Sequence, residues 1–516
     1  NMCGIIGYSG PKEPLPILIS GLSRLEYRGY DSAGVALIDG DNLSIEKKEG
    51  KLSVLKEHLE GTSIKGNIGI GHTRWATHGV PSDVNAHPHA DNANEFAIIH
   101  NGIIENYAEL KDDLIQDDYS FISETDTEVV AVELSRKWNG ELLDTVLDVA
   151  KSLDGTYALV VTSTKQPGTI VAGRMMSPLV LGVGEGEVFL ASDSAAILEY
   201  TNKMIFLENG DFVEINDGNF TLYDIEKNVI TRDIQVIDWE VSEAEKAGHD
   251  HFMYKEILEQ AEVIERTIAG RIEKNSTEIP IHLDKAKKFE KIWIVACGTA
   301  YHAGLFGKDL FEKVLGVPVS VELASEFRYR EPIIGKNDLA IVISQSGETM
   351  DTIAATELLK ENGSHVLALV NVVGSSLARM ADSVFYLHVG PEIGVASTKA
   401  YLGMLVGQLL LAKHWDSNNK LDTSLEEIKA LPSLIEEALK CEDQVKEISK
   451  LIYKKKDIYF IGRGLDYALA AEGALKLKEI SYLHAEALAA GELKHGTLAL
   501  IEEGTPVIVT ASQRHL

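Results

Sequence analysis

Cysteine is scarce in this chain, which has only Cys3, Cys297 and Cys441 among 516 residues. Three cysteines cannot form a disulfide framework or a cysteine-rich zinc site, so we expect a reducing compartment. Long apolar runs are also missing: the longest, residues 401–412, is broken by glycines and Gln408 and is too short to cross a bilayer. The start of the sequence has no basic stretch before its apolar residues, as a signal peptide would require. We therefore expect a cytoplasmic protein, with no metal and no cofactor.

Positive charge is also under-represented. Lysine and arginine total 49 against 79 aspartates and glutamates, which gives a net charge of −30. This balance argues against binding to nucleic acids or anionic membranes, because both usually need a basic face. It does not exclude small anionic substrates, since a pocket can be locally positive. Prolines number only 13 and 45% of residues are hydrophobic, as in an ordinary globular protein, and the length predicts two to four domains.

Residues 3–238 are rich in short β-like runs bounded by turns. Two helical patterns interrupt them, at residues 14–25 and 126–138, and the second follows a helix-start signature with several candidate N-caps, SETDTE (123–128). This pattern predicts an α+β domain with two sheets covered by helices. The expected strands are residues 4–7, 34–38, 68–71, 96–99, 157–162, 170–173, 179–182 and 188–191.

The pattern changes after a polar, charge-dense segment at residues 239–250, which we interpret as a linker. A helical stretch covers residues 251–272, and an alternation of strand, glycine turn and helix follows. The strands are continuous apolar runs, which are typical of strands buried on both faces of a parallel sheet. They are expected at residues 291–296, 338–343, 366–370, 383–387, 458–461 and 506–510.

An internal repeat relates two parts of this second half. A shift of 166 residues aligns KIWIVACGTAYHAGLFGKDLFEKV (291–314) with DIYFIGRGLDYALAAEGALKLKEI (457–480), with strand, turn and helix in register. We infer two tandem doubly wound α/β domains, at residues 251–430 and 431–516, the second of which stops early. The identical pairs are Ile292 and Ile458, Gly298 and Gly464, Tyr301 and Tyr467, and Gly307 and Gly473.

Several residues of the first domain suit catalysis on an amino acid. Cys3 follows a methionine whose removal would leave an amino-terminal cysteine, and its α-amine could then take the thiol proton; the alternative is a small buried residue in the first strand. Arg74 can hold a carboxylate in bidentate fashion. Asn101 and the backbone N–H of Gly102 follow an apolar strand and suit an oxyanion hole. Asp126 either pairs with a substrate ammonium or caps its helix.

Six motifs stand out in this domain: CGIIGY (3–8), LEYRGYDSAG (25–34), GHTRWATHG (71–79), NAHPH (85–89), HNGIIENY (100–107) and SETDTE (123–128). They resemble the class II glutamine amidotransferases, which are N-terminal-nucleophile glutaminases with a four-layer sandwich fold. The resemblance implies that Cys3 attacks the glutamine carboxamide, with its α-amine as the base, and that Asn101 and Gly102 form the oxyanion hole. It further implies a gate to the ammonia path at Trp75. The residues implied to hold the amino-acid end of glutamine are Arg74, Thr77, His78 and Asp126.

Asn1 and Met2 precede Cys3 in this sequence, so the cysteine is not amino-terminal as written. We interpret Asn1 as the remnant of an expression tag that prevents ordinary methionine removal. We therefore expect impaired glutaminase activity in this polypeptide. A comparison with a chain that begins at Cys3 tests this expectation, and equal rates of glutamine hydrolysis would refute it.

Polar turns follow the strands of the second half. The segment SQSGET (344–349) lies between a strand and a helix, where hydroxyls, a glycine and free N–H groups can cradle a phosphate; an ordinary N-cap turn has the same composition. Thr299 lies in the equivalent turn one strand earlier, so the two turns are expected to converge at the carboxyl ends of the strands. A third polar turn covers residues 392–399.

Further along, Glu472, Lys476 and Glu479 share one face of a predicted helix. This face is either functional or an exposed, salt-bridged surface. His495 lies in a glycine-flanked turn, where an acid–base role is chemically reasonable.

These segments resemble the paired sugar isomerase (SIS) domains of amidotransferases that make glucosamine 6-phosphate from glutamine and fructose 6-phosphate. The motifs are ACGTAYHAG (296–304), VELASEFRYR (321–330), SQSGETMDT (344–352), NVVGSSL (371–377), EIGVASTKAY (392–401), GRGLDYALAAEGALKLKEISYLHAEA (462–487) and AAGELKHG (489–496). The resemblance implies that Glu479 moves a proton between C1 and C2, that Lys476 assists near these carbons, and that His495 opens the sugar ring. The residues implied to bind the sugar phosphate are Thr299, Ser344, Gln345, Ser346 and Thr349, with Val395 and Ser397 against the sugar. A homodimer is also implied.

The same family continues beyond the position of Leu516, with a tail whose lysine forms an imine with fructose 6-phosphate and which helps to close an ammonia channel. Because this sequence lacks that tail, we expect the 516 residues alone to lack synthase activity and the last strand to leave an incomplete sheet.

Three other functions share parts of the pattern. Phosphoribosylpyrophosphate amidotransferases share the first domain, but the sequence has no matching Asp-Asp phosphoribosyl loop. A sugar-phosphate-sensing regulator would need a helix-turn-helix segment or a basic face, and neither is found. A SIS enzyme acting on another sugar phosphate, such as a deglycase, has no obvious need for a glutaminase domain.

Overall fold

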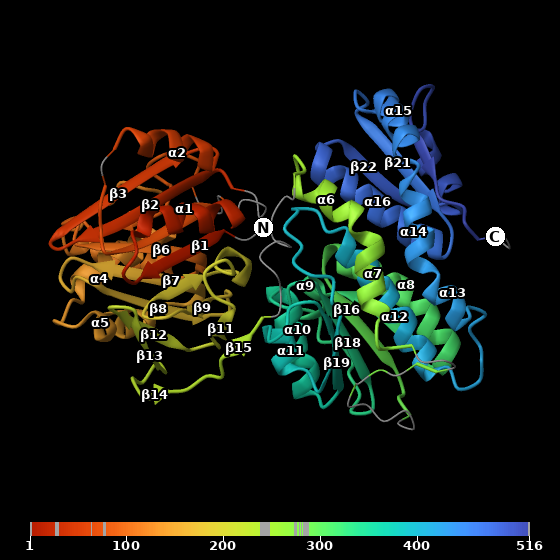
Figure 1. The fold of residues 1–516 in the computed structure, drawn as a ribbon, viewed down its shortest axis with the longest axis horizontal. Helices are drawn as coiled ribbons and strands as arrows, with labels where there is room; N and C mark the ends of the chain where they lie inside the picture. Colours follow the sequence, from red (N-terminus) through yellow and green to blue (C-terminus); the bar gives the residue numbers. More distant parts are fainter. Residues whose placement is uncertain are drawn as a thin grey trace. The chain divides into compact units, whose positions relative to one another are not determined.

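A computed structural model describes residues 3–25, 30–62, 64–75, 79–237, 248–272, 276–277, 279, 281 and 288–513. The chain divides into two compact units, residues 1–244 and 245–516 (Figure 1). Most of the predicted linker, residues 239–250, lies outside the described residues, and the predicted domain boundaries stay predictions. Within the described ranges, no helix is both long and apolar enough to span a membrane.

The first unit contains two antiparallel sheets. The eight-stranded sheet has the order β15-β11-β9-β10-β1-β4-β2-β3, and the seven-stranded sheet has the order β14-β13-β12-β8-β7-β6-β5. The strands of the first sheet are β1 (Gly4–Ser9), β2 (Ser32–Asp39), β3 (Asn42–Glu49), β4 (Ile68–Arg74), β9 (Val180–Val183), β10 (Val188–Ala191), β11 (Lys203–Phe206) and β15 (Gln235–Val236). Those of the second are β5 (His89–Ala90), β6 (Phe96–Ile104), β7 (Gly155–Ser163), β8 (Thr169–Met175), β12 (Phe212–Asn216), β13 (Asn219–Tyr223) and β14 (Val229–Ile230).

The two sheets and their helices form four layers, as predicted (Figure 1). Inward side chains of both sheets share one core, in which Ile70 of β4 clusters with Ile99 of β6 and Val160 of β7. Helices α1 (Pro14–Leu25) and α2 (Leu52–Glu60) pack on the outer face of the first sheet. A second core joins the outer face of the other sheet to α3 (Tyr107–Gln116), α4 (Asp126–Arg136) and α5 (Leu142–Ala150).

The second unit is built around a parallel sheet with the order β17-β16-β18-β19-β20. Its strands are β16 (Ile292–Ala296), β17 (Val319–Leu323), β18 (Leu339–Ser344), β19 (His365–Val370) and β20 (Ser383–Tyr386). One apolar core covers one face with α7 (Gln260–Ile268), α8 (Gly298–Leu315) and α12 (Lys399–Trp415). Another covers the opposite face with α9 (Ala324–Phe327), α10 (Met350–Glu361) and α11 (Ser376–Met380). This arrangement is the doubly wound fold that the apolar strands predict.

The repeated copy begins again after three helices, α13 (Leu425–Lys429), α14 (Leu431–Leu439) and α15 (Glu442–Ile452). Strand β21 (Asp457–Gly462) leads into α16 (Leu465–Ser481) and pairs in parallel with β22 (His484–Ala489) and β23 (Val507–Val509). Gly298 and Gly464, which the repeat aligns, both have a left-handed φ, of 54° and 59°. The sequence repeat is therefore a structural repeat. The helix predicted over residues 251–272 is instead two helices, α6 (Phe252–Leu258) and α7.

Candidate active sites

Cys3 directly precedes β1, at one end of the first sheet. Its Sγ accepts a hydrogen bond from the N–H of Trp75 at 3.2 Å and lies 3.6 Å from the carbonyl oxygen of the same residue. Burial raises the pKa of the Cys3 thiol, although the Trp75 N–H and the positive charge of Arg74 act in the opposite direction. The resting thiol is therefore protonated at neutral pH and needs a base before it can attack.

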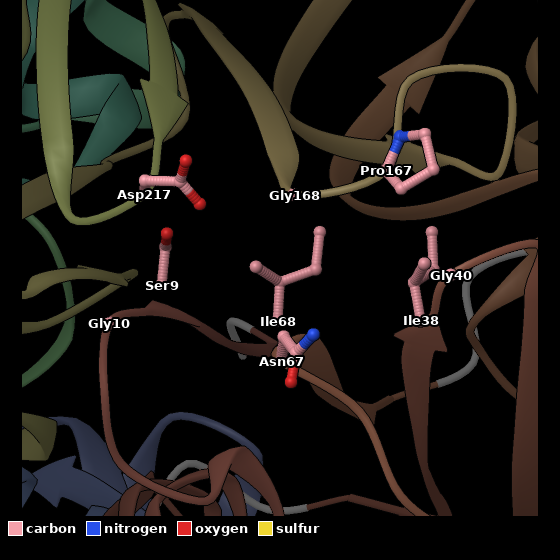
Figure 2. Close-up of a pocket in the computed structure, with 9 residues that line it drawn as sticks. All are labelled: Ser9, Gly10, Ile38, Gly40, Asn67, Ile68, Pro167, Gly168 and Asp217. Atoms are coloured by element: carbon pink, nitrogen blue, oxygen red, sulfur yellow. The ribbon is translucent and has the colours of Figure 1, made fainter.

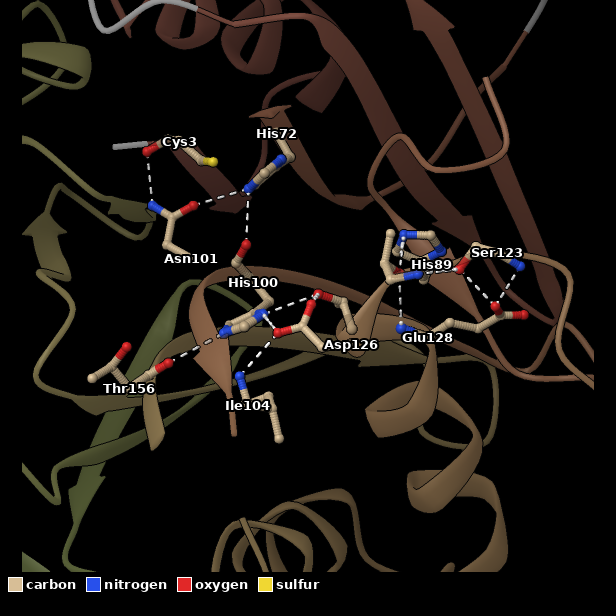
Figure 3. A network of polar contacts seen from close by, with 12 residues as sticks. Cys3, His72, His89, His100, Asn101, Ile104, Ser123, Asp126, Glu128 and Thr156 are labelled. Carbon is tan, nitrogen blue, oxygen red and sulfur yellow. Dashed lines mark hydrogen bonds and ion pairs between the residues drawn. The ribbon is translucent and has the colours of Figure 1, made fainter. Parts of the chain in front are cut away.

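Asn101 of β6, in the other sheet, reaches the same place. Its Nδ2 donates to the backbone oxygen of Cys3 at 2.8 Å, and its Oδ1 lies 2.9 Å from Nε2 of His72 (Figure 3). The next residue, Gly102, has a φ of 130°, and a Cβ there would lie 1.9 Å from the backbone oxygen of Thr156. Only glycine fits this position. The structure thus brings together the predicted nucleophile and one of the predicted oxyanion donors.

Asp126 is the first residue of α4 but does not cap it. Thr125 is the N-cap residue, and its hydroxyl accepts from the N–H of Glu128 at 3.3 Å, so the capping interpretation of Asp126 is wrong. The buried carboxylate of Asp126 accepts from the N–H of Ile104 at 2.9 Å and lies 4.0 Å from Nδ1 of His100 (Figure 3). Its charge is therefore held in place and remains consistent with binding an ammonium group.

The other predicted glutamine-binding residues follow β4. Arg74 is the last residue of this strand and is buried, whereas 41% of Trp75 is exposed. Thr77 and His78 lie outside the described residues. A cavity of about 240 Å³ in the same unit lies beside Ser9, at the opposite end of β1 from Cys3 (Figure 2). Its other lining residues, Asn67 and Asp217 among them, belong to turns and strand ends and include none of the predicted site residues.

The predicted phosphate-binding turn joins β18 to α10 in the second unit. The hydroxyls of Ser344 and Thr349 are hydrogen-bonded at 3.0 Å, and Ser344 Oγ also accepts from the N–H of Gly347. Ser346 Oγ accepts from the backbone N–H of Glu348 at 3.1 Å. Gly347 has a φ of 68°, and a Cβ there would lie 2.0 Å from Oγ of Ser375. Hydroxyls and backbone N–H groups thus converge at the carboxyl end of β18, together with the backbone of Gln345, whose oxygen accepts from the N–H of Asn371.

The predicted acid–base residues of α16 contact the first turn of α8. Nζ of Lys476 donates to Thr299 Oγ1 at 2.9 Å and forms an ion pair with Glu479. Thr299 Oγ1 in turn donates to Oε1 of Glu472 at 2.9 Å, and His302 Nδ1 lies 2.8 Å from the other oxygen of that carboxylate. Only 4% of Glu472 is exposed, whereas Glu479 is exposed and ion-paired with Lys476. The interpretation of this helix face as an exposed salt-bridged surface is therefore wrong for Glu472 but describes Glu479.

Glu472 and His302 therefore belong to this cluster. The sequence places Glu472 on the same helix face as Lys476 but gives it no specific role, and it does not single out His302. The spacing of Glu472, four residues before Lys476, was a usable signal, since residues so spaced share a helix face. Nothing in the sequence marks His302, because its contact joins residues 170 positions apart.

Two carboxylates shape the predicted sugar-contact turn. Glu392 accepts from Ser397 Oγ at 2.7 Å and from the N–H of Thr398 at 2.8 Å. Glu256 of α6 accepts from the N–H groups of Ile393 and Gly394, at 2.5 and 2.9 Å. Burial, reinforced by the charge of Glu392, raises the pKa of Glu256 to about 7. Val395 lies between the segments that Glu256 and Glu392 hold, and 61% of it is exposed and accessible to a ligand.

His495 lies between two short 3₁₀ segments, Glu492–Lys494 and Thr497–Leu500. Its N–H donates to the oxygen of Glu492 at 2.8 Å. Among the described residues, no hydrogen bond or ion pair joins His495 to Lys476 or Glu479. Across all residues that the structure describes, no group of three or more His, Cys, Asp or Glu residues is arranged to hold a metal ion.

Comparison with known proteins finds a domain family that matches each unit. The profile of the glutamine amidotransferase domain matches residues 44–237, and that of the SIS domain matches residues 285–413 and 451–516. The glutamine–fructose-6-phosphate aminotransferase (isomerizing) of Caldanaerobacter subterraneus is 50% identical over 100% of this chain and 86% of its own length. The same enzyme of Aquifex aeolicus is 46% identical over 99% of this chain and 85% of its own length.

Among solved structures, the C-terminal domain of glucosamine-fructose-6-phosphate aminotransferase from Francisella tularensis is 42% identical, covers 51% of this chain and 77% of its own, and has a TM-score of 0.48. Identity near 50% over the whole chain, with both domain types in the same order, decides the family. This chain belongs to the glutamine–fructose-6-phosphate aminotransferase (isomerizing) family.

Proposed function

We propose that this protein transfers the amide nitrogen of L-glutamine to D-fructose 6-phosphate and isomerises the product to D-glucosamine 6-phosphate, releasing L-glutamate. The observation that carries the proposal is that one chain of this family holds both clusters. In the first, an asparagine amide donates to the backbone oxygen of Cys3; in the second, a Lys–Glu pair contacts Thr299 at the start of α8. A glutaminase site alone would not need a sugar-phosphate site, and a sugar-phosphate site alone would not need a glutaminase site.

In the glutaminase half, the α-amine of a chain that begins at Cys3 takes the thiol proton, and Sγ attacks the carboxamide carbon of glutamine. Asn101 Nδ2 and the N–H of Gly102 stabilise the oxyanion of the tetrahedral intermediate. Ammonia leaves with that proton, and water then hydrolyses the thioester to glutamate. The substrate's carboxylate and ammonium are assigned to Arg74 and Asp126, together with Thr77 and His78, and the ammonia gate to Trp75.

In the sugar half, the turn of residues 344–349 binds the phosphate, and His495 opens the sugar ring. Ammonia condenses with the C2 carbonyl and water leaves. Glu479 then removes a proton from C1 and returns it to C2, and Lys476 stabilises the charge that develops between these steps. Ammonia would have to pass between the sites without contact with solvent, because water would protonate it. The remaining sugar contacts are assigned to Thr299, Val395 and Ser397.

We also propose that the protein is a homodimer and cytoplasmic; its three unpaired cysteines fit a reducing compartment. Two variants separate the half-reactions. Cys3→Ala should abolish glutamine-dependent synthesis of glucosamine 6-phosphate but retain synthesis from ammonia. Glu479→Gln should abolish synthesis from both nitrogen sources but retain glutamine hydrolysis. These measurements use a chain that begins at Cys3 and includes the C-terminal tail of the family. The proposal fails if that chain makes no glucosamine 6-phosphate from either source, or if its Cys3→Ala variant hydrolyses glutamine at the wild-type rate.

A further inference from the structure

His72 lies on β4 of the first sheet, directly opposite Ile5 of β1, and is fully buried. Its Nε2 reaches across the core to β6, where it lies 2.9 Å from Oδ1 of Asn101 and 3.1 Å from the backbone oxygen of His100. Both partners are oxygen acceptors, so Nε2 must carry the proton. The imidazole is therefore a donor to Asn101 (Figure 3).

The orientation of the Asn101 amide follows from its two neighbours. The backbone oxygen of Cys3 can only accept, so the amide nitrogen must face Cys3. The amide oxygen then faces His72, whose N–H meets it. A flipped amide would set its oxygen against the Cys3 oxygen and its NH₂ against the His72 N–H, and would lose both bonds. The two contacts thus specify one orientation.

The protonation state of His72 supports the same role. Its Nδ1 is buried and has no hydrogen-bond partner among the described residues, so a proton there would be an unsatisfied buried donor. Burial lowers the pKa of His72 to about 3, with a further contribution from the neighbouring positive charge of Arg74. His72 therefore stays neutral, with its proton on Nε2, throughout the pH range in which the thiol reacts.

We propose that His72 is a positioning residue for glutamine hydrolysis, holding the Asn101 amide so that one N–H of Nδ2 remains directed toward the oxyanion. One N–H of Nδ2 is used by the backbone of Cys3, the residue that carries the nucleophile. The second N–H of Nδ2 donates a hydrogen bond to the oxyanion. Without His72, the amide can rotate, and this donor is lost for part of the time.

This inference rests on the proposed glutaminase function, and a matched pair of variants tests it. His72→Phe keeps an aromatic ring in the stack that His72 forms with His87, whose ring centroid lies 4.3 Å away, but removes the donor. His87→Phe changes the same stack and removes no contact with Asn101. His72→Gln keeps an N–H donor and serves as the conservative variant.

Steady-state glutamine hydrolysis is measured on chains that begin at Cys3. We expect kcat to fall roughly 10- to 100-fold in His72→Phe with KM changed less than about threefold, because the oxyanion exists only in the transition state and the intermediate. His72→Gln should recover at least about fivefold of that loss, and His87→Phe should stay within about threefold of wild type. An equal loss of kcat in both phenylalanine variants would overturn the inference.

Alkylation of Cys3 by iodoacetamide, followed by mass spectrometry of its peptide, supplies a second readout. This displacement forms no oxyanion, so its rate in His72→Phe should remain within about threefold of wild type. A parallel fall in alkylation and hydrolysis would place the defect in the nucleophile or the fold and overturn the positioning role. If Cys3→Ala itself hydrolyses glutamine, the proposed function fails instead, so the two failures are distinguishable.

Discussion

Replacing Glu256 with glutamine should remove a pH dependence from the stability of the second unit. Only 2% of Glu256 is exposed, and its carboxylate accepts from the N–H groups of Ile393 and Gly394. Those bonds and the charge of Lys399 favour the ionised form, but burial and the facing carboxylate of Glu392 outweigh them. The pKa of Glu256 therefore rises from 4.5 to about 7 in the folded protein.

The sign of the effect follows from proton binding. Between pH 4.5 and about 7 the folded protein holds a proton on Glu256 that the unfolded chain has released, so stability falls as pH rises. The contribution is fully present below pH 4.5 and is lost above about pH 7. At about 1.4 kcal/mol per pKa unit, the whole effect is about 3 kcal/mol, of which about 2.5 kcal/mol is lost between pH 5 and 8.

Urea unfolding of wild type and Glu256→Gln across pH 5 to 8 measures this loss. The glutamine cannot titrate, yet its side-chain oxygen can still accept from the turn. Relative to wild type, the variant should gain about 2.5 kcal/mol between pH 5 and pH 8. Glu265→Gln, on the exposed side of α7, is the matched control and should show a constant difference. A difference for Glu256→Gln that also stays constant within about 0.5 kcal/mol would refute the argument.

Two further substitutions test the packing of each site. Gly102→Ala should lower the free energy of unfolding by at least about 3 kcal/mol and abolish glutamine hydrolysis, because its Cβ would overlap the backbone oxygen of Thr156. Gly140→Ala, which also has a positive φ but meets open space, should cost about 1 kcal/mol in the same urea measurement and leave hydrolysis unchanged. Glu472→Leu should lower the free energy of unfolding of the second unit by about 3 kcal/mol in urea. It should also abolish synthesis while sparing glutamine hydrolysis. Its control is Glu437→Leu, which removes an exposed ion pair and should lower the free energy of unfolding by less than about 1 kcal/mol.

The sequence predicted elements well where local signals agreed with tertiary packing. Helix α1 has the predicted bounds because Pro14 fits a helix start and apolar residues recur on one face up to Leu25. Strand β22 was missed, since HAEALA is rich in helix formers and becomes a strand only by pairing in parallel with β21. Short edge strands such as β14 and β15, two residues each, carry too little pattern to predict.

The same contrast holds within the sites. Cys3, Asn101 and Gly102 could be singled out as candidates because they stand in recognisable motifs, Cys3 just before β1 and the other two on β6. The anchoring roles of His72 and Glu256 could not, because their contacts span 29 and 137 residues and depend on which strands and helices come together. Local sequence specifies which groups can react. No local pattern predicts the tertiary contacts that hold those groups in one orientation.

The internal repeat gives the sugar site a property that neither copy has alone. In each copy a glycine with positive φ lies in the turn between a strand and a helix, and these helices, α8 and α16, pack against each other. The first turn of α8 thereby supplies Thr299 and His302 to the buried carboxylate of Glu472 on α16. Without α8, that carboxylate would lose two hydrogen bonds and keep only Lys476. A buried charge with so few partners is strongly destabilising, so the second copy depends on the first for the burial of Glu472.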